Sequence, residues 1–222
     1  MNMNPENYRA ICEELKPHHC RLVAVSKTKP VEDILQLYGA GQRVFGENKV
    51  QEMCSKYEQL PKDIEWHLIG HLQTNKVKYI APFVRLIHSV DSLKLLAEID
   101  KQAQKNNRVI DVLLQMFIAD EETKFGLSEP EAEELLISTE YTRLQNVRIC
   151  GLMGMATNTG DEAKIASEFA QLQSFFKKLK TSFFSAQPHF KELSMGMSAD
   201  YKIALRYGST YIRVGSMLFG ER

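Results

Sequence analysis

Short apolar runs alternate with stretches of helical periodicity along most of the chain. Eight of these runs have the length and the apolar or β-branched content of buried strands. They span residues 21–27, 43–48, 65–70, 85–90, 109–116, 147–155, 192–198 and 211–220. The pattern therefore predicts eight strands with helical segments between them.

The helical segments show apolar residues on one face. A short amphipathic helix is predicted near residues 5–15, before the first strand. The longest predicted helix has one apolar stripe, and two shorter ones follow the first and second strands. Their apolar faces consist of Ile165, Phe169, Leu172, Phe176, Leu179 and Phe183; of Val31, Ile34, Leu35 and Tyr38; and of Val50, Met53, Cys54 and Tyr57. The segment 71–80 has the weakest helical pattern.

Alternating strands and helices have two main solutions, an open doubly wound sheet and a closed (β/α)8 barrel. The chain has 222 residues, which suits a minimal barrel. No G-x-G-x-x-G turn opens an early helix, which argues against a dinucleotide-binding sheet. We therefore expect one α/β domain over residues 1–222, a single (β/α)8 TIM barrel.

Composition narrows the function. The 28 basic and 28 acidic residues balance, which argues against strong binding to nucleic acid or to an anionic membrane. The four cysteines form no C-x-x-C pair, and no segment has the apolar length of a signal peptide core or a membrane span. The adjacent His18 and His19 have poor geometry for one metal ion. We expect a cytoplasmic protein with no metal site.

Candidate chemistry lies where the predicted strands end, since barrel enzymes place their sites there. Lys27 ends the first strand on the same face as Val23 and Val25, and the last two strands end in Ser198, Gly215 and Ser216. Taken alone, such a lysine is usually a solvated charge and Gly-Ser usually a plain turn. Together they indicate an amine that faces a phosphate cup. Such a site suits an aldehyde-bearing phosphate ester, either pyridoxal 5′-phosphate (PLP) or a sugar phosphate.

Arg213 favours PLP over a sugar phosphate. It lies two residues before Gly215, on the same face of the last strand. An inward arginine could donate a hydrogen bond to the pyridine nitrogen of PLP, which would keep that nitrogen unprotonated and weaken the ring as an electron sink. A structural ion pair is the alternative role for this side chain.

Six motifs occur in order, about one for each strand. They are AVSKTKP, VFGENKVQE, WHLIGHLQTNK, IHSVDS, LSMGMSADYKIAL and GSTYIRVGSMLFGER. Over residues 8–222 the chain resembles the PLP homeostasis protein family. The resemblance implies a barrel similar to the N-terminal domain of alanine racemase, with PLP attached covalently to Lys27 as a Schiff base.

The resemblance also implies roles for other residues. Arg213 would contact the ring nitrogen and Asn48 the ring near its 3-hydroxyl group, while Ser198, Gly215 and Ser216 would hold the phosphate beside Met197. The mouth would be lined by His71, Ser89 and Met153. The implied function is control of free PLP and of amino-acid balance, without catalytic turnover, and PLP-dependent apoenzymes are possible partners.

Two enzyme functions remain as alternatives. A PLP-dependent racemase needs a second base on the opposite face of the ring, which alanine racemase takes from a separate domain. We expect no such domain here, and no reason places Tyr201, Tyr207 or Tyr211 opposite Lys27. A class I aldolase fits Lys27 and the phosphate cup but has no use for Arg213. Since the barrel leaves no apolar element over, we expect a monomer.

Overall fold

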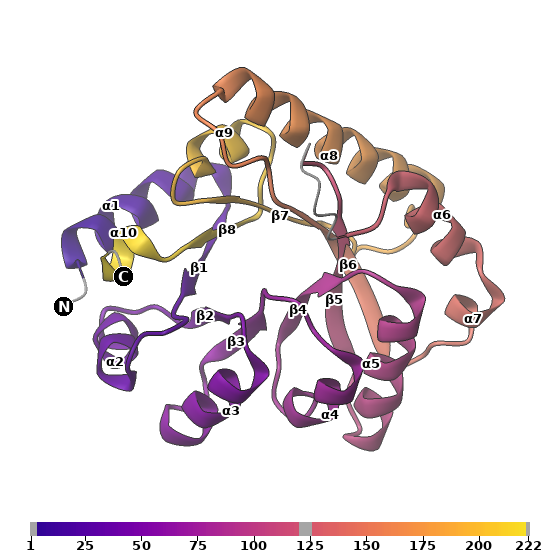
Figure 1. Ribbon diagram of the computed structural model, residues 1–222, viewed down its shortest axis with the longest axis horizontal. Helices are drawn as coiled ribbons and strands as arrows, with labels where there is room; N and C mark the ends of the chain where they lie inside the picture. The colour runs from indigo at the N-terminus through magenta and orange to yellow at the C-terminus, as the bar shows by residue number, and fades with distance from the viewer. Residues whose placement is uncertain (1–3, 120–125, 221–222) are drawn as a thin grey trace.

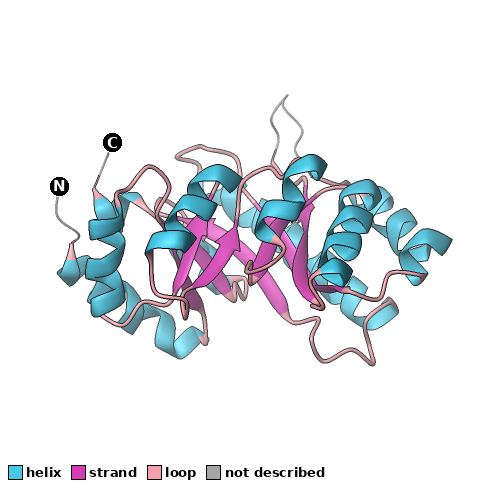
Figure 2. Ribbon diagram, turned by 90° about the horizontal axis from the view of Figure 1, so that it is seen from below, coloured by secondary structure: helices cyan, strands magenta, loops and turns pink. Residues whose placement is uncertain are grey.

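Eight parallel strands form a closed barrel, with the helices around its outside (Figures 1 and 2). The computed structural model describes residues 4–119 and 126–220. The strands pair in chain order, and β8 pairs with β1 to close the barrel. They are β1 Arg21–Val25, β2 Val44–Glu47, β3 Glu65–Leu68, β4 Leu86–Val90, β5 Ile110–Met116, β6 Val147–Gly154, β7 Glu192–Met197 and β8 Tyr211–Val214. The predicted α/β barrel is confirmed.

The helices begin where the sequence offers a capping side chain in several cases. Asn4, Ser92 and Asp161 accept hydrogen bonds from backbone N–H groups of the first helical turn, and Ser128 forms a capping box with Glu131. The helices are α1 Pro5–Leu15, α2 Val31–Gly39, α3 Val50–Gln59, α4 Val77–Ile80, α5 Leu93–Lys105, α6 Glu129–Ile137, α7 Thr139–Thr142, α8 Glu162–Ser182, α9 Tyr201–Arg206 and α10 Ser216–Phe219, with 3-10 turns η1 Lys16–His18 and η2 Thr74–Lys76. None of these helices is long and apolar enough to cross a membrane.

The prediction for the last strand was wrong in its second half. Strand β8 ends at Val214, and the apolar run after Gly215 forms the short helix α10. Leu218 and Phe219 are buried, and Asn7 of α1 donates a hydrogen bond to the Met217 carbonyl oxygen at 2.9 Å. The apolar run after Gly215, which the sequence pattern assigned to the strand, therefore forms a helix that packs against α1.

The buried face of α8 also differs from the predicted stripe. Phe169, Leu172 and Leu179 are buried as expected, but Phe175 is buried in place of Phe176. Phe176 is half-buried and stacks on Phe190, with ring centroids 4.9 Å apart. The predicted face of the helix is thus kept at Phe169, Leu172 and Leu179 and differs at the single turn that holds Phe175 and Phe176.

The core has two parts. Between the strands and the helices lie most of the large side chains, including Phe45, Trp66 and Phe169. A second, smaller cluster is packed from several strands and consists of Val23, Leu86, Leu113, Cys150, Met153 and Tyr211. In a barrel of this size such side chains fill the interior, so the ends of the strands are the places for binding sites.

Candidate functional site

A cavity of about 370 Å³ lies where the strands end. It brings together seven of the ten residues that the sequence nominated. These are Lys27, Asn48, Met197, Ser198, Arg213, Gly215 and Ser216. Its wall also includes side chains that sequence reasoning did not assign to the site, among them Lys29, Ile69 and Met155. The apolar side chains of Ile69 and Met155 carry no chemical signal in the sequence, so only the fold reveals that they belong to the wall.

The other three nominated residues are not among those that line this cavity. His71 is exposed, and its Nδ1 lies 3.7 Å from Oδ2 of Asp91. Ser89 is fully buried and donates a hydrogen bond to the Gly70 carbonyl oxygen at 2.6 Å. Met153 is fully buried in the smaller apolar cluster of the core. Ser89 thus links the ends of β3 and β4, and Met153 fills space beneath the mouth.

Lys27 sits in a turn that is held on both sides. Before it, the Ser26 hydroxyl donates to Oε1 of Glu47 at 2.6 Å, and Nζ of Lys56 donates to the Ser26 carbonyl oxygen at 2.7 Å. After it, the N–H of Thr28 donates to Oε1 of Glu52 at 2.6 Å. Thr28 itself has φ of 65°, an uncommon left-handed conformation for a β-branched residue. The strained turn and these bonds fix the backbone that carries Lys27.

Glu47 and Lys56 form the buried ion pair beneath this turn. Both side chains are almost fully buried, and Nζ of Lys56 lies 2.8 Å from Oε1 of Glu47. Burial raises the pKa of Glu47, and the charge of Lys56 opposes that rise. The pair joins β2, α3 and the Lys27 turn. Sequence reasoning missed it, although the spacing of Glu52 and Lys56 is that of a helical ion pair.

Asn48 reaches the cavity because Gly70 leaves room for it. A Cβ atom on Gly70 would lie 2.5 Å from the Asn48 carbonyl oxygen, closer than any real contact. Gly215 lines the cavity and also lies close to the end of β1. A Cβ there would lie 3.1 Å from the Val25 carbonyl oxygen, so this glycine serves the close approach of the chain to β1.

Arg213 carries a buried charge at the base of the cavity. Only 4% of it is exposed, and it donates hydrogen bonds to Oγ of Ser194 at 2.7 Å and to the Gly154 carbonyl oxygen at 3.0 Å. Burial lowers its pKa to about 10, so it stays protonated at neutral pH. The nearby Asp200 opposes this shift, but its carboxylate accepts a hydrogen bond from the backbone N–H of Met197 at 2.5 Å.

Behind Arg213 a chain of hydrogen bonds runs through the barrel. Oγ of Ser194 lies 2.9 Å from Nδ1 of His88, whose Nε2 lies 3.0 Å from Nδ1 of His67. Burial holds the pKa of His67 at about 3 and that of His88 well below its usual value, so both rings are neutral. Arginine can only donate, so Ser194 accepts from Arg213 and satisfies its own proton by donating to His88.

That assignment fixes both tautomers. His88 accepts at Nδ1 and donates from Nε2 to His67, which leaves the proton of His67 on Nε2. This atom is buried with no hydrogen-bond partner among the described residues. The ring stands edge-on to Tyr211, with centroids 5.3 Å apart at 71°. Each hydrogen bond in this chain is therefore donated in the same direction: from Arg213 to Ser194, from Ser194 to His88, and from His88 to His67.

Comparison with known proteins identifies the class first. Residues 5–222 match the model of the alanine racemase N-terminal domain family. Alanine racemase from Bartonella henselae shares the fold, with a TM-score of 0.71 at 17% identity over 96% of this chain and 58% of that chain. The chain is thus an alanine racemase N-terminal-like barrel.

Closer relatives define the family. The pyridoxal phosphate homeostasis protein of Aquifex aeolicus is 43% identical over 98% of this chain and 94% of its own length. The protein of the same name from Escherichia coli K12 is 35% identical over 93% of this chain and 87% of its own. PipY of Synechococcus elongatus, 37% identical, aligns over 97% of this chain and 99% of its own with TM-scores of 0.89 without PLP and 0.86 with PLP bound. The chain belongs to the pyridoxal phosphate homeostasis protein family.

Proposed function

We propose that the protein binds PLP in the cavity at the strand ends and holds it reversibly on Lys27. The ε-amine would add to the aldehyde carbon and lose water to form a Schiff base, and hydrolysis would reverse this. The names of the relatives and the PLP-bound structure of PipY support this proposal. The observation that carries it is the convergence of Lys27, Arg213 and two serine hydroxyls on one cavity.

The cavity has donors suited to the charged parts of PLP. The hydroxyls of Ser198 and Ser216 lie in its wall, and Ser216 begins α10, whose first N–H groups have no partner within the helix. These donors would hold the phosphate. Asn48, from the end of β2, is available to the 3-hydroxyl group.

Arg213 would contact the pyridine nitrogen. A guanidinium with a pKa of about 10 does not give up its proton at neutral pH, so it would donate a hydrogen bond and leave the ring nitrogen unprotonated. An unprotonated ring is a weaker electron sink than a pyridinium. Such a contact favours holding the cofactor over stabilising carbanions, and gives no advantage to a sugar-phosphate aldolase.

The cavity wall offers few acid–base groups. Among the described residues that line it, only Lys27, Lys29 and Arg213 are ionisable, and Nζ of Lys29 donates to the carbonyl oxygens of Phe219 and Gly220. The Tyr201 hydroxyl donates to Glu14 instead. A two-base racemase needs a second proton donor across the ring. We therefore propose a carrier without turnover, with a weak racemase as the second candidate.

We further propose that the protein is a cytoplasmic monomer that supplies PLP to apoenzymes. Its large exposed apolar residues are spread over different elements, such as Leu35 on α2, Tyr79 on α4 and Ile137 on α6. Scattered apolar side chains do not mark an interface. Light scattering coupled to size exclusion tests this state, and a stable dimer at micromolar concentration would contradict it.

Titration of the purified protein with PLP tests the function. The wild type should develop the near-ultraviolet and visible absorbance of a lysine-bound PLP, and Lys27→Ala should not, while keeping its thermal unfolding midpoint. Lys49→Gln, an exposed lysine close in sequence, is the matched control and should bind as wild type. Equal binding by Lys27→Ala would refute the attachment. Racemisation at rates typical of a dedicated enzyme would refute the carrier role.

A further inference from the structure

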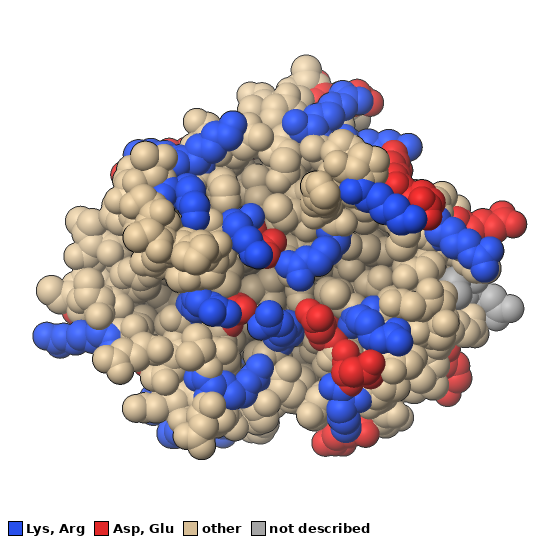
Figure 3. Space-filling view, turned by 180° about the vertical axis from the view of Figure 1, so that it is seen from behind, with Lys and Arg blue, Asp and Glu red and all other residues tan. Residues whose placement is uncertain are grey.

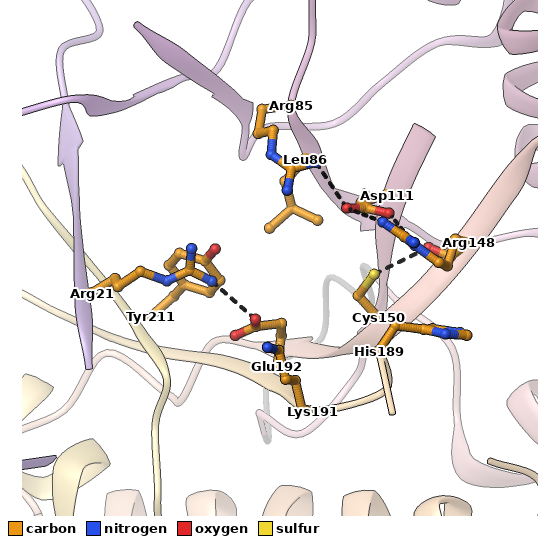
Figure 4. A pocket seen from close by; sticks show the side chains of 10 residues that line it. All are labelled: Arg21, Arg85, Leu86, Asp111, Arg148, Cys150, His189, Lys191, Glu192 and Tyr211. Carbon is orange, nitrogen blue, oxygen red and sulfur yellow. Dashed lines mark hydrogen bonds and ion pairs between the residues drawn. The ribbon is translucent and has the colours of Figure 1, made fainter. Parts of the chain in front are cut away.

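A second cavity lies at the opposite end of the barrel, where the strands begin (Figure 4). Its volume is about 220 Å³, and its wall is rich in charged side chains. The cations are Arg21, Arg85, Arg148 and Lys191, and the anions are Asp111 and Glu192. Figure 3 shows this end of the molecule, where basic and acidic side chains alternate around the middle of the face. This cavity has no part in the proposed PLP site.

Ion pairs hold the three arginines in place. One oxygen of Glu192 lies 2.9 Å from Arg21, which also stacks on the Tyr211 ring at 4.1 Å. The single carboxylate of Asp111 forms ion pairs with two arginines, at 3.0 Å to Arg85 and 2.6 Å to Arg148. The three arginine side chains are about half exposed, and the ion pairs orient their guanidinium groups at the cavity wall.

The carboxylates do not balance the cations. Four basic groups and two acidic groups line the cavity, an excess of two positive charges. Burial, followed by the charge of Arg148, lowers the pKa of the lining His189, so this ring adds no charge at neutral pH. Glu65 lies 3.8 Å from Arg85 and is not among the lining residues. After burial, the charges of Arg21 and Arg85 are the causes that lower the pKa of His67, so their field reaches the barrel interior.

The neutral polar groups of the wall add no negative charge, and the Cys150 thiol donates its proton to the Arg148 carbonyl oxygen at 3.6 Å. Burial raises the pKa of Tyr211 above its usual value and that of the Cys150 thiol to about 12, so both stay protonated at neutral pH. Each arginine has five N–H donors, and the ion pairs engage only one or two of them. In Figure 4, Arg21 and Arg85 reach toward the same open space from two sides.

We propose that this cavity binds a phosphate dianion, either free phosphate or the phosphate group of a small monoester. Two fixed guanidinium groups with spare donors match the oxygens of a tetrahedral dianion, and planar guanidinium is well suited to phosphate. A dianion also cancels the excess charge. The cavity is several times larger than the share of about 30 Å³ that one water molecule takes in the liquid, so a phosphate group fits.

Calorimetric titration with inorganic phosphate tests the proposal. Because phosphate could also enter the proposed PLP cavity, the titration uses wild type, Arg85→Gln and Ser216→Ala. Arg85→Gln should weaken phosphate binding at the cavity where the strands begin at least tenfold, whereas Ser216→Ala should affect only phosphate that enters the PLP cavity and leave binding where the strands begin unchanged. The reverse result, with binding lost in Ser216→Ala and kept in Arg85→Gln, would overturn the proposal. So would the absence of phosphate binding in the wild type at millimolar concentration.

A second variant guards against misfolding. Lys191 is exposed, so Lys191→Gln should fold normally and still weaken phosphate binding. Lys101→Gln, an exposed lysine on α5, is the matched control and should bind as wild type. Glycerol 3-phosphate in the same titration separates the two sources of the group, since tighter binding than phosphate would assign a monoester and weaker binding free phosphate. Unchanged phosphate affinity in both Arg85→Gln and Lys191→Gln would contradict the proposal and would mean that these charges only form ion pairs where the strands begin.

Discussion

Arg213 is a cation inside the barrel whose two hydrogen-bond acceptors are neutral oxygens. Its donors reach Ser194 and the Gly154 carbonyl, and the carboxylate of Asp200 is engaged by the Met197 N–H. A buried charge is costly unless hydrogen bonds compensate for it. The His88 ring, which receives the Ser194 proton, improves Ser194 as an acceptor for the guanidinium. Ser194 is therefore the residue that positions Arg213.

Ser194→Ala should destabilise the protein and disturb the cofactor. The change removes an acceptor from Arg213 and a donor from His88, and unpaired buried groups of this kind cost about 1–3 kcal/mol. Urea denaturation measures the loss, and the absorbance maximum of bound PLP should shift because Arg213 is no longer fixed. The exposed Ser185→Ala is the control. A stability equal to wild type would show that the chain of hydrogen bonds has no energetic role.

Ser216→Ala should weaken the retention of PLP. In the proposed site the change would remove one hydrogen bond to a charged phosphate, worth about 1.5–3 kcal/mol, which corresponds to a rise in Kd of roughly 10- to 150-fold. Equilibrium dialysis with PLP measures the change. Ser55→Ala, an exposed serine on α3, should leave the Kd as it is. An unchanged Kd in Ser216→Ala would place the phosphate elsewhere.

At the scale of the elements, α8 offers a test of how the helix faces the barrel. Phe169 is fully buried, so Phe169→Ala should cost about 3–5 kcal/mol of unfolding free energy. Phe176 is only half-buried, and Phe176→Ala should cost clearly less. Thermal and urea unfolding of the two variants compare these costs. Equal losses would mean that the helix presents the face that the sequence stripe suggested.

The strands were predictable because each buried run is short, apolar and bounded by polar segments. Seven of them were placed with ends that differ by one or two residues from the structure. The eighth was extended too far, since apolar content alone does not separate a strand from a short helix such as α10. Tertiary packing on α1, which decides between the two, has no local signal.

The candidate site was partly predictable for a similar reason. Residues that end strands share one rim of a barrel, which brought Lys27, Asn48 and Ser216 into one cavity. The same rule failed to separate rim from interior, so Met153 and Ser89 were nominated although both are fully buried. Contacts between distant segments, such as Lys56 with Glu47, follow only from the folded arrangement.

For the whole molecule, the ion pairs where the strands begin predict acid sensitivity. Burial alone would raise the pKa of Asp111, but hydrogen bonding and charge from Arg148, with the charge of Arg85, lower it below its usual value. A depressed carboxylate contributes stability that is present above its unfolded pKa of about 3.9 and lost as the pH falls through the folded value. Asp111→Asn should therefore flatten the loss of stability below about pH 4, measured by urea unfolding at each pH. If the unfolding free energy of Asp111→Asn fell with decreasing pH as steeply as that of wild type, this role of Asp111 would be contradicted.

The two ends of the barrel thus have different charge arrangements. One has a lysine and a buried arginine beside serine hydroxyls, and the other has an ordered layer of ion pairs with excess positive charge. The packed interior and the directed chain of hydrogen bonds from Arg213 to His67 lie between them.

Reduction of the PLP-treated protein tests the central claim most directly. Borohydride converts a Schiff base into a stable secondary amine, so peptide mapping by mass spectrometry then reports which lysine carried the cofactor. The account predicts one pyridoxyl group per chain, on Lys27. Labelling of another lysine such as Lys29, or no label at all, would contradict it.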